Sequence, residues 1–150
     1  DEATYNLHIM VRMEIEIALI EGKIEAKDLP EIWNTKMQDY LGVTPRTDSE
    51  GVLQDVHWSG GSIGYFPTYA LGNLISVQLW NKMLSDQPAI PEEMSRGEFG
   101  SILSWLRENV HRWNNRYDPQ ELVRRITGEG INPQPYMEYL WKKYGEVYRF

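Results

Sequence analysis

The sequence contains no cysteine, no HExxH motif and no long apolar run. The first absence excludes disulfide bonds, thiolate zinc sites and cysteine nucleophiles. The second excludes the helical two-histidine zinc site that this motif builds, so we expect no metal site within this chain. The third excludes a membrane-spanning helix, which needs roughly 20 apolar residues, and the first residues do not have the order of a signal peptide. We therefore expect a cytoplasmic protein that does not associate with membranes.

Basic residues are also scarce. Lysine and arginine number 15 against 22 acidic residues, which gives a formal net charge of −7. Binding to a phosphate backbone relies on clustered positive charge, so we do not expect a nucleic-acid partner. Hydrophobic residues make up 41% and charged residues 25% of the 150 residues, as in an ordinary globular domain. We predict one helical domain over residues 1–150.

The first region, Tyr5 to Glu21, carries two conflicting patterns. Apolar residues alternate with polar or small ones, which is a strand signal, at Val11, Met13, Ile15, Ile17 and Leu19. A helical stripe is equally visible at Leu7, Met10, Val11, Ile15 and Ala18. Because Met, Glu, Leu and Ala are helix formers and Gly22 supplies a stop, we predict a helix that is buried on more than one side.

The rest of the chain also reads as helices separated by polar loops. We predict them between Asp28 and Gly42, from Pro67 through Leu84, from Phe99 to Trp113, between Asp118 and Gly128, and from Asn132–Pro133 onward. Asp28 and Asp118 are expected to cap the helices that follow them. Pro88 and Pro91 are expected to lie in a loop. The prediction is an all-α fold of six or seven helices, with a glycine- and aromatic-rich loop over residues 51–66 before the long helix.

Two of the three histidines and most of the glutamates are best explained structurally. His8 with Arg12 fits a solvated or interhelical pair, and His111 fits a helix end, where the helix dipole favours a positive charge. The glutamates of the first helix fit a solvated face, at Glu14, Glu16 and Glu21. None of these residues has the spacing of a metal site or of a pair of catalytic carboxylates.

His57 differs because it lies in the glycine-rich loop, two residues after Asp55 and next to Trp58. One interpretation is a buried histidine satisfied by backbone groups, with Trp58 as a core anchor. The other is an imidazole aimed at a substrate oxygen, with Asp55 or a carbonyl fixing its tautomer. Tyr65 and Tyr69, four residues apart, either pack at the entrance to the helix or donate hydrogen bonds to a developing oxyanion.

The segment Gly51–Trp58, GVLQDVHW, matches the GxxQDxHW signature of the carboxypeptidase Taq family of zinc metallocarboxypeptidases. The resemblance continues through GYFPTYALGN and extends to the opening YNLHIMVRMEIEIALIEG and to ELVRRITG near the end. It therefore covers essentially the whole chain, in order. One departure is Asn114, near which family members tend to have a glycine.

The resemblance implies that this chain is the C-terminal portion of a helical peptidase about three times longer. The zinc would be held by an HExxH helix and a further glutamate in the preceding part, which this chain lacks. Asp1 would be the last residue of a second family signature, IRxxAD. The implied activity is zinc-dependent removal of C-terminal residues from peptides with broad specificity, and the isolated chain would be inactive. Family enzymes are commonly dimeric, so a homodimer is expected.

By position, the resemblance also implies roles for the residues of the loop. His57 would donate a hydrogen bond to the tetrahedral intermediate, helped by Tyr65 or Tyr69. Asp55 would orient His57, while Gln54 and Trp58 would shape or support the substrate pocket. The alternative is a stand-alone, non-catalytic helical module that keeps the loop only to bind peptides or to interact with other proteins.

Overall fold

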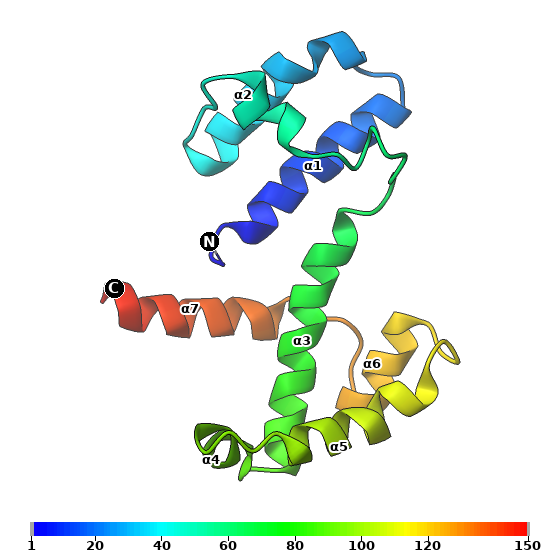
Figure 1. The fold of residues 1–150 in the computed structure, drawn as a ribbon, viewed down its shortest axis with the longest axis vertical. Helices are drawn as coiled ribbons and strands as arrows, with labels where there is room; N and C mark the ends of the chain where they lie inside the picture. The colour runs from blue at the N-terminus through cyan, green and yellow to red at the C-terminus, as the bar shows by residue number, and fades with distance from the viewer. Residues whose placement is uncertain (1, 150) are drawn as a thin grey trace. The chain divides into compact units, whose positions relative to one another are not determined.

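The computed structural model describes residues 2–149, and Figure 1 shows that these form helices joined by turns and loops, with a long connection between α2 and α3. The α-helices are α1 (Tyr5–Ile20), α2 (Leu29–Leu41), α3 (Pro67–Asp86), α4 (Ile90–Ser95), α5 (Gly100–Asn109), α6 (Pro119–Thr127) and α7 (Gln134–Tyr148). Four 3-10 turns accompany them: η1 (Ala26–Asp28), η2 (Asp48–Glu50), η3 (Val52–Gln54) and η4 (His111–Trp113). No strand occurs in the described part of the chain, which confirms the all-α prediction. Asp1, expected to end a family signature, lies outside the described residues.

The chain divides into two units, Asp1–Ala70 and Leu71–Phe150. The first unit contains α1, α2, the glycine-rich loop and the first turn of α3. The second contains the remainder of α3 and the helices α4 to α7. The expectation of a single domain stays a prediction. The two units are described separately below.

Helix α1 resolves the conflict between the strand and helix patterns in favour of the helix. Val11 and Ile15 are fully buried on one of its faces, and Ile9 and Glu16 are buried on another. Residues four or seven apart share a helix face, so these pairs define two separate buried sides. The predicted burial on more than one side is thus confirmed.

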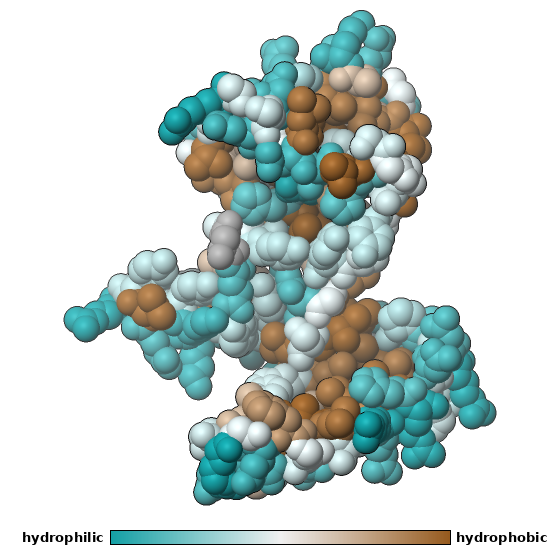
Figure 2. Space-filling model, in the orientation of Figure 1, coloured by the Kyte–Doolittle hydropathy of each residue, from teal (hydrophilic) through white to brown (hydrophobic). Residues whose placement is uncertain are grey.

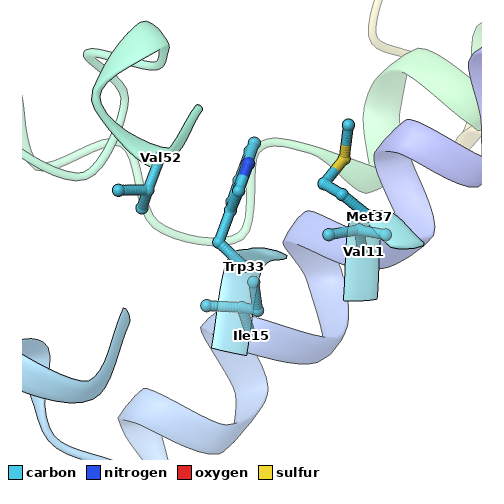
Figure 3. Close-up of a cluster of buried hydrophobic side chains, with 5 residues drawn as sticks. All are labelled: Val11, Ile15, Trp33, Met37 and Val52. Atoms are coloured by element: carbon cyan, nitrogen blue, oxygen red, sulfur yellow. The ribbon is translucent and has the colours of Figure 1, made fainter. Parts of the chain in front are cut away.

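The core of the first unit forms between α1, α2 and η3. Figure 3 shows Val11 and Ile15 from α1, Trp33 and Met37 from α2, and Val52 from η3 gathered in one cluster. Helix α2 ends at Gly42 in a left-handed conformation, as predicted.

Asp28 is the N-cap residue of α2, as predicted, but its side chain does not cap this helix. The Asp28 carboxylate accepts a hydrogen bond from the Glu25 amide at 3.1 Å and so closes η1 instead of capping α2. A carboxylate can satisfy either of two successive turns, and the local backbone decides which one.

The second unit has its own apolar cluster, built on Met83 of α3, Ile90 of α4 and Trp105 of α5. The expected loop around Pro88 and Pro91 in fact contains α4, because Pro91 lies in a first turn, where a missing amide costs nothing. The helix expected over Phe99–Trp113 is shorter: α5 ends at Asn109 and η4 follows.

Helix α6 agrees with the sequence prediction at both ends. The Asp118 carboxylate accepts from the Glu121 amide at 2.9 Å, and Gly128 ends the helix in a left-handed conformation. Helix α7 begins one residue after Pro133. No helix in the described part of the chain is long and apolar enough to span a bilayer.

The surface of the first unit retains apolar side chains, and Figure 2 shows brown, hydrophobic atoms on the face it presents. Along α1, after its first residue Tyr5, the exposed large apolar residues are Met10, Met13, Ile17 and Ile20. At 3.6 residues per turn they share one side of this helix, next to the side that carries Ile9 and Glu16. A stripe of this kind on a helix often marks an interaction surface.

Candidate active site

The loop between α2 and α3 packs closely at its start. Gly51 directly precedes η3, and a Cβ atom added there would lie 3.0 Å from the Pro45 side chain and 3.3 Å from Trp33 Nε1. No larger residue fits without displacing these neighbours, which explains a glycine at the first position of the GVLQDVHW segment. Further along, Gly61 and Gly64 have positive φ angles of 78° and 74°, which side chains rarely adopt.

His57 lies among aromatic rings. Its ring centroid is 4.7 Å from that of the buried Phe66, and the rings of Tyr65 and Tyr69 are 5.9 and 6.3 Å away. His57 Nε2 and the Tyr69 hydroxyl are 3.4 Å apart, and the tautomer of the imidazole decides which of them donates. The fold thus brings together the histidine and one of the tyrosines that the sequence analysis proposed as catalytic.

Asp55 has a partner that the sequence analysis did not anticipate. Its Oδ2 accepts a hydrogen bond from Arg12 Nε of α1 at 2.6 Å, with only 14% of the Arg12 side chain and 15% of the Asp55 side chain exposed. The other oxygen, Oδ1, is 3.7 Å from His57 Nδ1, which is beyond hydrogen-bond distance. Asp55 is therefore hydrogen-bonded to Arg12, while His57 lies near its carboxylate without a hydrogen bond.

These residues border a cleft of about 370 Å³ in the first unit. Its walls are formed by Tyr5, His8, Ile9 and Arg12 from α1, Asp55 and His57 from the loop, and Phe66 and Tyr69 at the start of α3. The lining thus combines an ion pair and two imidazoles with aromatic and aliphatic groups. Such a combination of apolar walls and a few convergent polar groups is typical of small-ligand sites.

Two groups that line the cleft have shifted pKa values. Burial, followed by the neighbouring Tyr65, raises the pKa of the Tyr69 phenol above its usual 10.0. Burial, followed by the Arg12 guanidinium, lowers the pKa of His8 from 6.5, although Asp55 acts in the opposite direction. At neutral pH the phenol keeps its proton and can donate a hydrogen bond, and the His8 imidazole is uncharged.

Glu16 of α1 binds the loop at two points, Trp58 and Gly64. This carboxylate is only 6% exposed, and it accepts from Trp58 Nε1 at 2.9 Å and from the Gly64 amide at 2.6 Å. The interpretation of Glu16 as part of a solvated face is therefore wrong. Trp58 itself packs against the core of the first unit and edge-on to Phe66, so it supports the loop without lining the cleft.

The remaining candidates lie at the edge of the site. The Tyr65 ring packs edge-on to Tyr69 and is 47% exposed, but it is not among the residues that line the cleft. The Gln54 side chain donates to the Ser49 carbonyl and closes the turn before the signature loop, away from the cleft. The expected roles of Tyr65 and Gln54 stay predictions.

Sequence reasoning missed the contribution of α1. Of the two alternatives for Arg12 with His8, a solvated or an interhelical pair, the solvated one is wrong, because Arg12 lines the cleft with only 14% of its side chain exposed. The missed signal is positional: His8, Arg12 and Glu16 follow one another at intervals of four, on one face of a helix. Nothing in the sequence shows that this face meets a loop more than 40 residues later.

The described residues do not fit a metal site. Within residues 2–149 no three histidine, aspartate or glutamate side chains are grouped so that they could hold a metal ion. In the cleft, the carboxylate closest to His57 is that of Asp55, which is already bound by a guanidinium whose charge would repel a cation. The chemistry of this cleft is that of hydrogen-bond donors and an ion pair.

A helical protein with a polar and aromatic cleft beside a GVLQDVHW loop has clear counterparts among known proteins. The family model described as carboxypeptidase Taq (M32) metallopeptidase matches residues 1–144. The match covers nearly the whole chain. The chain belongs to this family.

Individual relatives agree with this assignment. Carboxypeptidase 1 of Bacillus subtilis is 49% identical over 99% of this chain, and thermostable carboxypeptidase 1 of Thermus thermophilus is 47% identical over 99%. The crystal structure of the M32 carboxypeptidase from Deinococcus radiodurans, 39% identical, covers 98% of the chain with a TM-score of 0.92. The chain spans 30% of the length of the Bacillus and Deinococcus proteins and 29% of the length of the Thermus protein.

Proposed function

We propose that this chain is the C-terminal, substrate-cleft portion of a zinc-dependent metallocarboxypeptidase that removes C-terminal residues from peptides with broad specificity. The observation that carries the proposal is the cleft in which His57 Nε2 and the Tyr69 hydroxyl lie 3.4 Å apart. The chain belongs to a metallopeptidase family, and it spans only about 30% of the length of a carboxypeptidase relative, as a portion of such an enzyme would. The resemblance of residues 51–58 to a signature that accompanies such sites also supports the proposal.

In this proposal the protein groups of the cleft act on the peptide carbonyl. His57 and the protonated Tyr69 phenol donate hydrogen bonds to the carbonyl oxygen as it gains negative charge. One such donor typically contributes about 3 kcal/mol to catalysis. Asp55, bound by Arg12, lies 3.7 Å from His57 Nδ1 and would orient the ring from that side, while donation by His57 into the cleft requires a proton on Nε2. Tyr65 would assist at the exposed edge of the cleft.

The zinc ion would be held by residues outside this chain, because the described residues do not fit a metal site. We therefore expect the isolated 150-residue chain to bind no zinc stoichiometrically and to release no C-terminal residues from peptides. The complete enzyme would serve peptide turnover in the cytoplasm, where a chain without cysteine needs no disulfide bonds.

The test is a zinc-supplemented carboxypeptidase assay with metal analysis on the same samples. It compares the isolated chain with a protein extended by the upstream coding sequence, and with the same extended protein carrying His57→Gln. We expect activity and zinc only in the extended proteins, with the rate lowered at least about 100-fold by His57→Gln. Zinc-dependent turnover by the isolated chain would refute the proposal, as would an inactive extended protein that binds zinc.

The second candidate is a non-catalytic module that binds peptides or other proteins. The exposed stripe of Met10, Met13, Ile17 and Ile20 favours it, since flexible apolar side chains suit protein contacts. The discriminating observation is the coding sequence before Asp1. An HExxH motif in the same reading frame supports the carboxypeptidase, and an initiator codon immediately before Asp1 supports the module.

The exposed stripe also supports self-association, and we propose that the protein is a homodimer. Sedimentation at several concentrations tests this directly. Substituting Ile17 by Glu in the middle of the stripe should shift the protein toward the monomer if this face is the contact. A monomer at all concentrations, without any substitution, would refute the dimer.

A further inference from the structure

The backbone around His57 is attached to α1 on both sides. Two residues before the histidine, Asp55 accepts from Arg12 at 2.6 Å. One residue after it, Trp58 donates to Glu16 at 2.9 Å. Arg12 and Glu16 are four residues apart and share a helix face. A single turn of α1 therefore holds the loop immediately before and after its only histidine.

The Glu16 attachment requires a carboxylate. Both of its partners, the Trp58 indole and the Gly64 amide, are donors that cannot accept. A carboxylate has only acceptors and satisfies both, whereas an amide of the same shape would turn an NH₂ group toward one of them. This attachment also joins two points of the loop, six residues apart, so it fixes the turn that includes Gly61 as well as the position of Trp58.

The Arg12 attachment uses the shape of the guanidinium. Its Nε binds Asp55, and Nη1 donates to the His8 carbonyl at 2.7 Å. The plane of the group lies against the Trp33 ring, 4.8 Å from its centroid, and near the Phe66 ring at 5.8 Å. A lysine could keep the charge, but it offers neither the planar contact nor the fixed fork of donors.

His57 itself makes weak polar contacts with the protein. Its Nδ1 is buried and has no hydrogen-bond partner among residues 2–149, and its Nε2 lies at the 3.4 Å limit from Tyr69. The imidazole thus has no strong hydrogen bond of its own, and the neighbours of His57 in the chain determine its place more than its own bonds do.

We propose that Arg12 and Glu16 are positioning residues that hold His57 in the cleft by anchoring the loop before and after it. The inference rests on the proposed function only for its consequence in catalysis, because the anchoring concerns this chain alone. Neither residue belongs to the loop segment whose sequence suggested the site.

The first experiment uses the 150-residue chain labelled with ¹⁵N-histidine. Ring nitrogen shifts and contacts between the His57, Phe66 and Tyr69 rings are measured by NMR for the parent, Glu16→Gln and the matched control Glu21→Gln. Glu21 lies at the end of the same helix with its side chain about half exposed. We expect Glu16→Gln to move the His57 ring nitrogens by several ppm and to weaken its contacts with Phe66, while Glu21→Gln changes neither.

His111 in the second unit is an internal reference, since a change confined to His57 cannot come from general unfolding. A folded Glu16→Gln protein with unchanged His57 signals would overturn the proposal. If Glu16→Gln does not fold, Trp58→Phe serves instead, because it removes the indole donor and keeps a smaller aromatic ring at this position. The same His57 change supports the proposal, and unchanged signals overturn it.

Arg12→Lys tests the other attachment in the same assay. It retains the charge beside Asp55, so a purely electrostatic role predicts an unchanged His57 spectrum. Positioning by the planar fork predicts altered ring contacts and nitrogen shifts. The double variant Arg12→Lys/Glu16→Gln should change His57 by less than the sum of the two single changes, because both act on the same short segment.

The second experiment measures kinetics in the protein extended by the upstream sequence. Glu16→Gln should lower kcat by about tenfold or more with little change in KM, because it displaces a donor from the reacting oxygen without removing a substrate contact. If kcat holds while the NMR signals move, the anchoring is upheld and its catalytic consequence is refuted. If His57→Gln also leaves kcat unchanged, the proposed role of His57 fails separately.

Discussion

Each of the two units has one deeply buried polar side chain in the described part of the chain. A comparison of the two shows how the hydrogen-bonding groups around a buried residue determine whether a carboxylate or an amide fits there. Glu16 of the first unit is 6% exposed and Gln78 of the second is 3% exposed. Both project from a helix and hold a glycine-containing loop. Glu16 accepts two hydrogen bonds, whereas Gln78 donates to the Gly130 carbonyl at 2.9 Å and accepts from the Asn132 amide at 3.0 Å.

The difference lies in what each loop offers. The loop around Gly64 presents two donors, so only an acceptor-only group satisfies it. The loop around Gly130 presents one carbonyl and one amide, so an amide side chain matches it. The first loop carries His57 and borders the cleft, while the second closes the connection between α6 and α7. A buried polar side chain that hydrogen-bonds a loop therefore supports a candidate active site in the first unit and only the fold in the second.

Each of these two side chains can be replaced by the other type, as Gln78→Glu and Glu16→Gln. The free energy of unfolding should fall most in Gln78→Glu. In Gln78→Glu, an oxygen would replace Nε2 and face the Gly130 carbonyl, with the Glu129 carboxylate 3.4 Å away. We expect a loss of about 3 kcal/mol in the free energy of unfolding, since a buried charge would lack a partner. Urea unfolding measures it. The matched control is Gln120→Glu, where the accepting Oε1 that binds the Ile131 amide is kept on an exposed residue. Equal losses in both variants would contradict the explanation.

The reciprocal exchange, Glu16→Gln, should cost less because no charge is buried. One of the two donors, Trp58 Nε1 or the Gly64 amide, would face an NH₂ group and lose its partner. The expected loss is about 2 kcal/mol by the same urea measurement. Glu21→Gln, at the exposed end of α1, should change stability by no more than about 0.5 kcal/mol. A Glu16→Gln protein as stable as the parent would mean that the loop is not held as described.

The second unit also contains a residue with a strained backbone conformation. A substitution that relieves this strain should raise the free energy of unfolding, whereas the two exchanges above lower it. Asn114 follows η4 with φ 45° and ψ −126°, a conformation that favours glycine. Asn114→Gly should therefore raise the free energy of unfolding by about 1 kcal/mol. The control is Asn115→Gly, because the neighbouring residue has no positive φ and glycine there only adds freedom to the unfolded chain. Destabilisation by Asn114→Gly would refute the strain.

The smallest expected effect is a dependence on pH that belongs to the cleft. The pKa of His8 is lowered in the folded chain, mainly by burial and then by Arg12. The unfolded chain therefore binds the proton more readily, so stability is full above pH 6.5 and falls as the pH is lowered toward the folded-state pKa. Unfolding free energies measured between pH 7.5 and 5 should show this fall. His8→Gln should flatten it, whereas the control His111→Gln should keep it.

Where the sequence predicted structure correctly, the deciding interactions were local. Asp118 caps α6 as its position before Pro119 and Glu121 predicted, and Gly42 and Gly128 end their helices. The alternation of Val11, Met13 and Ile15 was misleading because helix formers surround it, and the helix stripe was the correct guide. Local prediction failed at Asp28, where one carboxylate had two turns within reach.

The site was only half predictable, for a related reason. The resemblance pointed to His57, Asp55 and Tyr69 within 15 residues of one another, and the structure brings these three to one cleft. It gave no indication of Arg12 and Glu16, which meet the loop across more than 40 residues. A periodic pattern shows which residues share a helix face, but it does not show what that face will contact.

The sequence by itself thus determined the helices, most of their ends and the loop that bears the family signature, since these depend on residues within a few positions of each other. Only the tertiary structure decided what the buried sides of α1 contact, and that Arg12 and Glu16 bind the loop residues before and after His57. A charged side chain such as that of Glu16 is stable in water or against two donors, and the sequence looks the same in both cases. The choice depends on packing between segments far apart in the chain, which bury the carboxylate only where its partners are already in place.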